Sequence, residues 1–234
     1  MVLPRIREPR SAPVMGTDAH LPPLGPKALT AQALRLRLSS TSGFVPEHHG
    51  DGRLNLGRAA TAASVLVPLV LRDDGLHVLL TQRSAKLRDH AGQISFPGGR
   101  AEAFDVDAVA TALRETEEEI GLARMHVEVI GSMPPYTTVT SYVVTPVVAL
   151  VHPPFVLTLD AFEVDEAFEV PLQFLMTPAH HQRHRVHIEG SEREFLSMPW
   201  APPGTTKEHF IWGATAAMLR NLYWLLAPRQ DGVS

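Results

Sequence analysis

The stretch RETEEEIG, residues 114–121, decides how this chain is interpreted. It places four glutamates in five positions directly before a glycine that ends a predicted helix. The C-terminal end of a helix carries partial negative charge, so each acid there costs about 0.3–1 kcal/mol instead of stabilising the helix. Like charges at i, i+4 add a penalty of about 0.2–0.5 kcal/mol per pair. The arrangement therefore calls for a compensating positive charge.

The helical spacing indicates where that charge would lie. Glu115, Glu118 and Glu119 stand at i, i+3 and i+4, so their carboxylates face one side of the helix. Glu117 is rotated away from them. Hard divalent cations such as Mg2+ or Mn2+ prefer carboxylate oxygens as ligands. The three glutamates predict a site for such a cation, and the alternative is a solvated acidic face paired with basic neighbours.

Composition excludes several classes of protein. The chain has 234 residues, of which 44% are hydrophobic, which is enough for a sizeable core. The net charge of -4 gives no overall positive field for nucleic acid. The absence of cysteine excludes disulfides, thiolate nucleophiles and sulfur-ligated metals. The longest apolar run, SVLVPLVL, is far shorter than the roughly 18 residues of a membrane helix. We expect a cytoplasmic protein without nucleic-acid or membrane partners.

The pattern along the chain predicts one folded domain. Residues 1–28 contain six prolines and little apolar periodicity, so we expect a proline-rich, disordered arm there and a single domain over residues 29–230. Thr30 is a candidate N-cap for a short helix. The expected strands are 64–72 and 75–83, joined as a hairpin, then 125–132, 141–151, 193–200 and 208–212; the other expected helices are 108–119, 169–176 and 213–226. This order predicts a mixed sheet covered by helices.

Together with ISFPGGR at residues 94–100, the acidic helix resembles the Nudix box. The matching residues are Gly99, Arg114, Glu115, Glu118, Glu119, Gly121 and Leu122. Asp105 stands where the first glutamate of the box belongs, eight residues instead of seven separate it from Arg114, and Thr116 replaces an aliphatic residue. The resemblance implies an α/β/α sandwich with a mixed sheet, and hydrolysis of a diphosphate bond with Mg2+ or Mn2+.

A second segment, LLTQRSAKLRDHAGQISFPGG at residues 79–99, resembles the signature of the coenzyme A diphosphatase branch of that family. The positions that match include Arg83, Ser84, Arg88, Gly92 and Phe96, the last of which begins FPGG. That branch also tends to carry an aspartate and an extra residue inside the box. The resemblance implies cleavage of coenzyme A into 3',5'-ADP and 4'-phosphopantetheine.

The resemblance also implies roles for acidic residues. Glu115, Glu118 and Glu119 are the expected metal ligands. Glu115 is the first candidate for the base that activates water. The second candidate is Glu166 in FEVDEAFEV, residues 162–170, which we expect to be a loop that could fold over the site. Simple solvation is the alternative for the acids of this segment.

Other residues are candidates for contacts with the substrate. Arg83 and Arg88 could bind phosphate groups, because guanidinium matches phosphate in a bidentate way, or they could pair with nearby acids. Gly98 and Gly99 provide backbone that can approach the diphosphate or the metal closely. Tyr136 could line the substrate pocket or pack in a turn after two prolines.

Two alternative functions remain open at this point. The same metal helix could act on ADP-ribose or another nucleoside diphosphate derivative, because the box specifies the diphosphate and not its substituents. A Nudix domain could also be a non-catalytic, nucleotide-sensing module, although the complete set of acids argues against this. In each case the partner is a small molecule of the coenzyme A or nucleotide class. The sequence does not decide whether the chain forms a homodimer.

Overall fold

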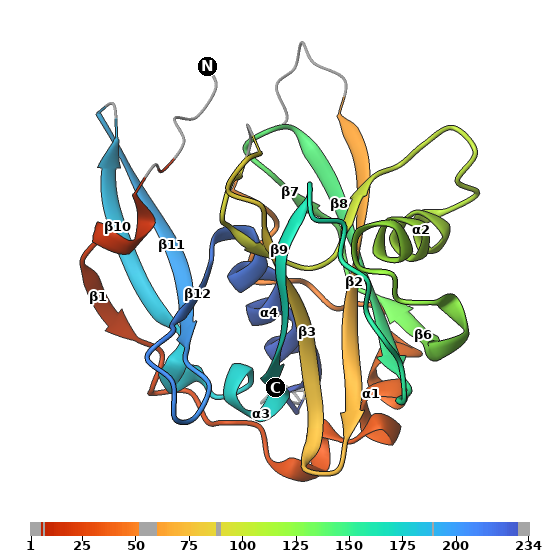
Figure 1. Ribbon diagram of the computed structural model, residues 1–234. Helices are drawn as coiled ribbons and strands as arrows, with labels where there is room; N and C mark the ends of the chain where they lie inside the picture. Colours follow the sequence, from red (N-terminus) through yellow and green to blue (C-terminus); the bar gives the residue numbers. More distant parts are fainter. Residues whose placement is uncertain (1–5, 7, 52–59, 88–89, 189, 229–234) are drawn as a thin grey trace.

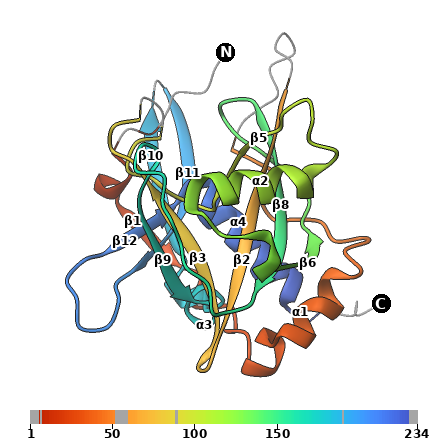
Figure 2. The ribbon, with the colours of Figure 1, turned by 45° about the vertical axis from the view of Figure 1, so that its right-hand side comes forward.

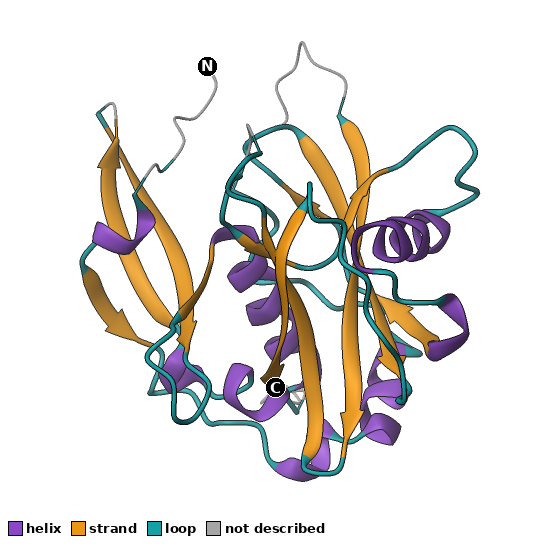
Figure 3. Ribbon diagram, in the orientation of Figure 1, coloured by secondary structure: helices purple, strands orange, loops and turns teal. Residues whose placement is uncertain are grey.

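Two β-sheets and four α-helices form the protein in its computed structural model, which describes residues 6, 8–51, 60–87, 90–188 and 190–228 (Figures 1 and 3). The helices are α1 Ala31–Leu38, α2 Ala108–Ile120, α3 Leu172–Leu175 and α4 Gly213–Leu226. The strands are β1 Val14–Thr17, β2 Thr61–Arg72, β3 Gly75–Arg83, β4 Ile94–Ser95, β5 Gly98–Arg100, β6 Val127–Ser132, β7 Tyr136–Thr137, β8 Tyr142–Val151, β9 Val164–Pro171, β10 Gln182–Ile188, β11 Ser191–Trp200 and β12 His209–Trp212. No helix within these described ranges is long and apolar enough to cross a membrane.

The larger sheet is mixed, as the sequence predicts. Its main path runs β4-β3-β2-β8-β6, with β5 beside β2, β7 beside β8 and β9 beside β3. The predicted hairpin of β2 and β3 is confirmed, with Arg72 opposite Gly75 at the turn. Strands β2 and β8 pair in parallel over ten positions, whereas the other pairs are antiparallel. Both strands are long and largely apolar, as is typical of parallel strands that are covered on both faces.

Helices cover both faces of the larger sheet (Figures 1 and 2). One apolar cluster packs α2 against the sheet and includes Leu79, Ala112 and Ile120. The other cluster, which includes Leu80 and Leu222, lies between the sheet and α4. Adjacent residues of β3 enter opposite clusters because side chains alternate along a strand. The predicted α/β/α sandwich is confirmed.

The N-terminal segment differs from the expected disordered arm. Val14–Thr17 form β1, which pairs with β10 at the edge of the smaller sheet, β1-β10-β11-β12. Asp18 is buried, and its Oδ1 lies 2.6 Å from Arg183 Nε. Leu24 packs in the cluster that faces α4. Backbone pairing, an ion pair on the buried Asp18 and apolar contacts thus outweigh the high proline content. Of this segment, only residues 1–5 and 7 lie outside the described residues.

Asp107 and Gly121 fix the two ends of α2, and the sequence predicted the second of them. The Asp107 carboxylate accepts a hydrogen bond from Ala110 N at 2.8 Å, as an N-cap does. Gly121 ends the helix with φ 68°, a left-handed conformation that favours glycine. The last turn of the helix therefore carries Glu118 and Glu119 in a defined position beside β5 and the end of β3.

Candidate active site on the acidic helix

Glu119 is the most buried acid of α2. Its side chain is 5% exposed, and its Oε2 accepts a hydrogen bond from Gly98 N at 3.0 Å. Its Oε1 lies 3.5 Å from Arg83 Nη1, at the end of β3. Burial raises the pKa of Glu119 to about 7. A carboxylate with this pKa gains strongly from a nearby positive charge, because such a charge favours its ionised form.

Glu115 lies against the glycine pair of β5. A Cβ atom on Gly99 would lie 2.3 Å from Glu115 Oε2, so only glycine leaves this carboxylate its position. Gly98 has φ 147°, and a Cβ there would lie 2.4 Å from Ser64 O. Burial also raises the pKa of Glu115. The two glycines therefore have different roles. Gly98 allows a left-handed backbone conformation packed against Ser64, whereas Gly99 leaves space for the Glu115 carboxylate.

Arg114 joins the acids through one guanidinium group. Its Nε and Nη2 donate to the two oxygens of Asp105 at 3.0 and 2.8 Å. Its Nη1 donates to Glu115 Oε1 at 2.8 Å and to Glu118 Oε2 at 3.0 Å. Arg100 O accepts a further bond at 3.1 Å. Arg114 therefore orients the acidic cluster, and Asp105, which departs from the usual box, is its bidentate partner.

The chemistry of this set of side chains fits a hard divalent cation. Carboxylate oxygens of Glu115 and Glu118 converge on a single nitrogen of Arg114, and Glu119 supplies a third, buried carboxylate on the next turn. Within the described part of the chain, no three acidic or histidine side chains are already arranged around one point for a metal. The Glu118 side chain is 61% exposed, so it can turn away from Arg114 at little cost.

Arg83 and Arg88, the two candidates for phosphate binding in residues 79–99, differ in what the structure describes. Arg83 reaches the acidic cluster through Glu119, and its buried Nε has no hydrogen-bond partner among the described residues. This leaves a guanidinium donor next to the acids, as binding of an anionic group requires. Arg88 lies outside the described residues, so its expected role in substrate binding stays a prediction.

The structure does not bring Glu166 to the helix acids. The segment expected as a loop is largely β9, which pairs with β3, and Glu166 stands opposite Gln82. Its neighbour Ala167 packs in the cluster under α2, so Glu166 faces the opposite side of the sheet. There its Oε2 lies 2.5 Å from Lys207 Nζ and 3.3 Å from His209 Nε2. The alternation of apolar residues in this segment was the missed signal for a strand.

Glu163, just before β9, lies closer to the acidic cluster. Its carbonyl accepts a hydrogen bond from Ser84 N at 2.8 Å, next to Arg83. After burial, the charge of Glu163 is among the influences that raise the pKa of both Glu115 and Glu119. The sequence does not distinguish Glu163 from the other acids of residues 162–170. The pairing of β9 with the distant strand β3 decides which of these acids faces α2.

Tyr136 lies apart from the acids. It belongs to β7, is 3% exposed, and packs in the apolar cluster that faces α4. Burial raises the pKa of its hydroxyl group. Of the two readings of this residue, the packed position is the one that the structure shows.

Comparison with known proteins identifies the family. The model of the NUDIX domain matches residues 60–189. An uncharacterized Nudix hydrolase, NudL, of Escherichia coli strain K12 is 44% identical over 162 residues, which cover 68% of this chain and 80% of the relative. NudL of E. coli O7:K1 is 43% identical over the same length.

Solved structures give more distant matches. A Nudix hydrolase from M. smegmatis, RenU, is 21% identical with a TM-score of 0.44, covering 53% of this chain and 81% of that one. An Ap4A hydrolase from C. elegans in a binary complex is 19% identical with a TM-score of 0.42, covering 51% of this chain and 85% of that one. Both scores are low, so the assignment rests on the family model and the sequence relatives. The chain belongs to the Nudix family and is a hydrolase that acts on diphosphate bonds.

Proposed function

We propose that this chain hydrolyses the diphosphate bond of coenzyme A or its derivatives, giving 3',5'-ADP and 4'-phosphopantetheine. The observation that carries the proposal is the contact of Arg83 with Glu119 at 3.5 Å. Arg83 belongs to the segment 79–99 that resembles the coenzyme A branch, and Glu119 belongs to the Nudix box. The segment that suggests the substrate thus lies directly beside the acids that suggest the reaction.

The same proposal assigns Mg2+ or Mn2+ to Glu115, Glu118 and Glu119. When bound, the cation would supply charge neutralisation at the diphosphate and a lower pKa for the attacking water. Glu115 and Glu118 can turn from Arg114 to a cation while Arg114 itself stays in place. Asp105 holds it through two hydrogen bonds, at 2.8 and 3.0 Å, and through a charge pair that keeps the pKa of Asp105 well below its usual range. Arg114 therefore positions the ligands.

Proton transfer and anion binding fall to the remaining groups. Glu115 is half-buried beside Gly99, and its raised pKa suits a carboxylate that accepts a proton from water. Glu163 is the second candidate, in place of Glu166, because it lies on the α2 side of the sheet end. Arg83 would donate to phosphoryl oxygens and offset their charge in the transition state.

A substrate comparison tests this function. Initial rates are measured with coenzyme A, an acyl-coenzyme A, ADP-ribose and a dinucleoside polyphosphate, each with and without Mg2+ or Mn2+. We expect the highest kcat/KM for a coenzyme A substrate, and activity only with metal. An equal or higher kcat/KM for ADP-ribose would overturn the substrate assignment, and tight binding without turnover of any substrate would favour a sensing module.

A further inference from the structure

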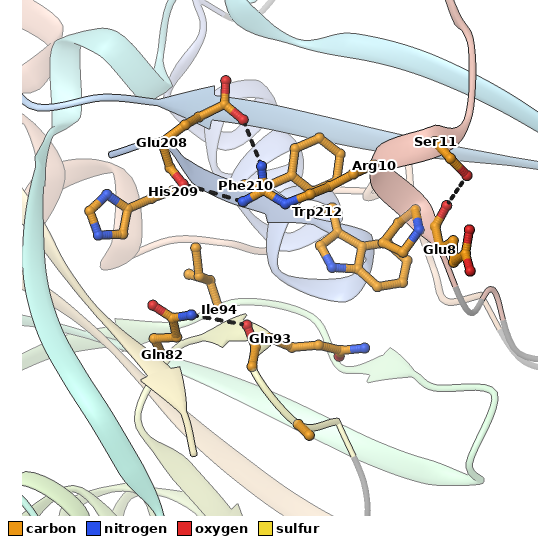
Figure 4. Close-up of a pocket in the computed structure, with 13 residues that line it drawn as sticks. Glu8, Arg10, Ser11, Gln82, Gln93, Ile94, Glu208, His209, Phe210 and Trp212 are labelled. Atoms are coloured by element: carbon orange, nitrogen blue, oxygen red, sulfur yellow. Dashed lines mark hydrogen bonds and ion pairs between the residues drawn. The ribbon is translucent and has the colours of Figure 1, made fainter. Parts of the chain in front are cut away.

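A cleft lies between the N-terminal segment, the end of β3 and β12 (Figure 4). Its walls come from the N-terminal residues 8–11, from Gln82 with residues 91–94, and from β12 with the residue before it. Its volume is about 410 Å³, within the roughly 300–1,000 Å³ of small-molecule sites. The N-terminal segment, which the proposed reaction leaves without a task, thus forms one wall of a ligand-sized cleft.

The shape of the cleft suits a flat ring. Trp212 lies on one side, and Gln82, Gln93 and Ile94 lie on the other (Figure 4). Ile94 and Phe210 are almost fully buried, at 6% and 9% exposure, and give the cleft an apolar base. An indole face opposite carboxamide groups can stack a planar heterocycle and read its polar edge.

The two glutamines present complementary groups. Gln93 Oε1 lies 2.8 Å from His90 Nδ1, which turns the Nε2 donor of Gln93 away from that ring. Gln82 Nε2 donates to Gly92 O at 3.5 Å, which turns the Oε1 acceptor of Gln82 away from that carbonyl. Gln82 therefore offers an acceptor and Gln93 a donor, and adenine carries both an amino donor and ring-nitrogen acceptors to which such groups can bond.

The charges in the cleft do not favour a phosphate group. Arg10 is its cation, and Arg10 Nη1 already donates to Glu208 Oε1 at 2.9 Å while Nη2 donates to Glu208 O at 3.2 Å. The Arg10 guanidinium also lies 5.0 Å above the ring of Phe210, and Glu8 adds a further negative charge. A neutral ring therefore fits this cleft better than an anion, and any phosphates would remain outside it.

The cleft and the acidic cluster share one stretch of chain. Gln82 lines the cleft and the next residue, Arg83, contacts Glu119. Ile94 lines the cleft and Gly98, four positions later, donates to Glu119, so at most about 14 Å of chain separates these two residues. A single nucleotide is long enough to join two places this close around the end of the sheet.

From these contacts we propose that the cleft binds the adenine ring of the substrate, stacked on Trp212 and read by Gln82 and Gln93. The inference rests on the proposed function, because coenzyme A brings an adenine to this site. It also gives the N-terminal segment a task, since Arg10 holds that segment against β12 and so closes the cleft.

The test is binding of 3',5'-ADP to the full-length, metal-free protein by calorimetry, with pantetheine as the second probe. Variants are Trp212→Leu, Trp212→Phe and Gln93→Ala, with Gln32→Ala on the exposed face of α1 as a matched control. We expect Trp212→Leu to weaken binding of 3',5'-ADP at least about tenfold, because base stacking on an aromatic ring typically accounts for that much. Trp212→Phe should restore most of the affinity, Gln93→Ala should weaken it, and Gln32→Ala should leave it unchanged.

The outcomes separate this inference from the proposed function. Wild-type affinity in Trp212→Leu, no binding of 3',5'-ADP to the wild type, or Trp212-dependent binding of pantetheine would each overturn the adenine site. In parallel, KM for coenzyme A hydrolysis is measured for the same variants. Trp212-dependent binding of 3',5'-ADP without any hydrolysis of coenzyme A would leave the adenine site standing and reject the proposed function. Hydrolysis of coenzyme A with the same KM in the wild type and Trp212→Leu would support the proposed function and reject the adenine site.

Discussion

Asp105 and Arg114 form a bidentate ion pair across the loop that leads into α2, with both carboxylate oxygens bonded to guanidinium nitrogens at 3.0 and 2.8 Å. The shorter aspartate stands at the position of a glutamate in the usual box, and one extra residue separates the partners. The pair shows that the changed spacing still delivers a carboxylate to Arg114. Arg114 in turn reaches Glu115 and Glu118, so this pair sets the geometry of the proposed metal ligands.

Removing the charge of Asp105 should weaken metal binding. In Asp105→Asn, Arg114 loses its bidentate partner and competes more strongly for Glu115 and Glu118. Loss of such an outer partner typically costs about 10–100-fold in metal affinity. We expect the Mg2+ concentration for half-maximal activity to rise by about that factor, whereas Asp73→Asn in the exposed β2–β3 turn should leave it unchanged. An unchanged metal requirement in Asp105→Asn would show that Arg114 does not compete with the cation.

The two glycines of β5 should respond differently to alanine. In Gly99→Ala the new Cβ meets only the flexible end of Glu115, at 2.3 Å, so the carboxylate moves and the fold remains. We expect kcat to fall at least about tenfold with little change in the unfolding midpoint. In Gly98→Ala the Cβ meets backbone atoms of Ser64 and Val65 at a φ of 147°, so stability should fall by about 1–3 kcal/mol. Equal losses of stability in both variants would contradict this division.

Substitutions of Glu163, just before β9, and of Glu166, within β9, should have different effects on kcat. Glu163→Gln should reduce kcat about tenfold or more, because Glu163 lies on the side of Glu115 and Glu119. Glu166→Gln should leave kcat close to the wild-type value, since Glu166 pairs with Lys207 on the other face. Initial rates at saturating coenzyme A and Mg2+ provide the comparison. The opposite ranking of the two variants would return Glu166 to the site.

His181 should make the protein less stable in mild acid. It is fully buried; Arg220 Nη1 donates to its Nδ1 at 3.1 Å, and its Nε2 donates to Leu175 O at 2.7 Å. Burial lowers the pKa of His181 to about 4, so the folded protein keeps the ring neutral while the unfolded chain takes up a proton near pH 6.5. The contribution of His181 to stability should therefore be lost as pH falls from about 6.5 towards 4, by up to about 3 kcal/mol, whereas Glu119, whose pKa is raised to about 7, contributes with the opposite sign over this range.

Urea unfolding at pH 7.5, 5.5 and 4.5 checks this pH dependence. His181→Gln keeps a donor and an acceptor but cannot be protonated, so its stability relative to that of the wild type should rise as pH falls from 7.5 to 4.5, because the contribution of Glu119 is common to both proteins. His20→Gln, at an exposed position, is the matched control and should follow the wild type. The comparison does not go below pH 4.5, because below that pH the contribution of Glu47 is lost as well. Burial would raise the pKa of Glu47, but hydrogen bonds from Arg220 and Trp224 outweigh it and lower the pKa to about 2. Parallel curves for wild type and His181→Gln would contradict the assignment.

Local signals predicted the parts of the fold that depend on neighbours in sequence. The Asp-Asp-Gly turn, the apolar runs of β2 and β3, and Gly121 at the end of α2 each act within a few residues. The helical spacing likewise indicated that Glu115 and Glu118 lie close together, and both reach Arg114 Nη1. These are the features for which sequence and structure agree.

Features that depend on distant partners were not predictable in the same way. Strand β1 forms because β10, more than 160 positions later, offers an edge and Arg183 binds Asp18. The register of β9 on β3 decides that Glu166 faces Lys207 and that Glu163 stays near α2. A single sequence does not reveal such register, because both faces of β9 carry acids and apolar residues.

The most direct test of the central claim is release of 3',5'-ADP from coenzyme A by the wild type, Glu119→Gln and Glu117→Gln, each with and without Mg2+. Glu117 lies on the same helix but pairs with Arg124 at 3.2 Å, so it is the matched control for removal of one acid. We predict Mg2+-dependent release by the wild type and Glu117→Gln, and a loss of at least about a hundredfold in folded Glu119→Gln. Release that is independent of Mg2+, or that survives in Glu119→Gln, would contradict the claim that the buried acid of α2 holds a catalytic cation.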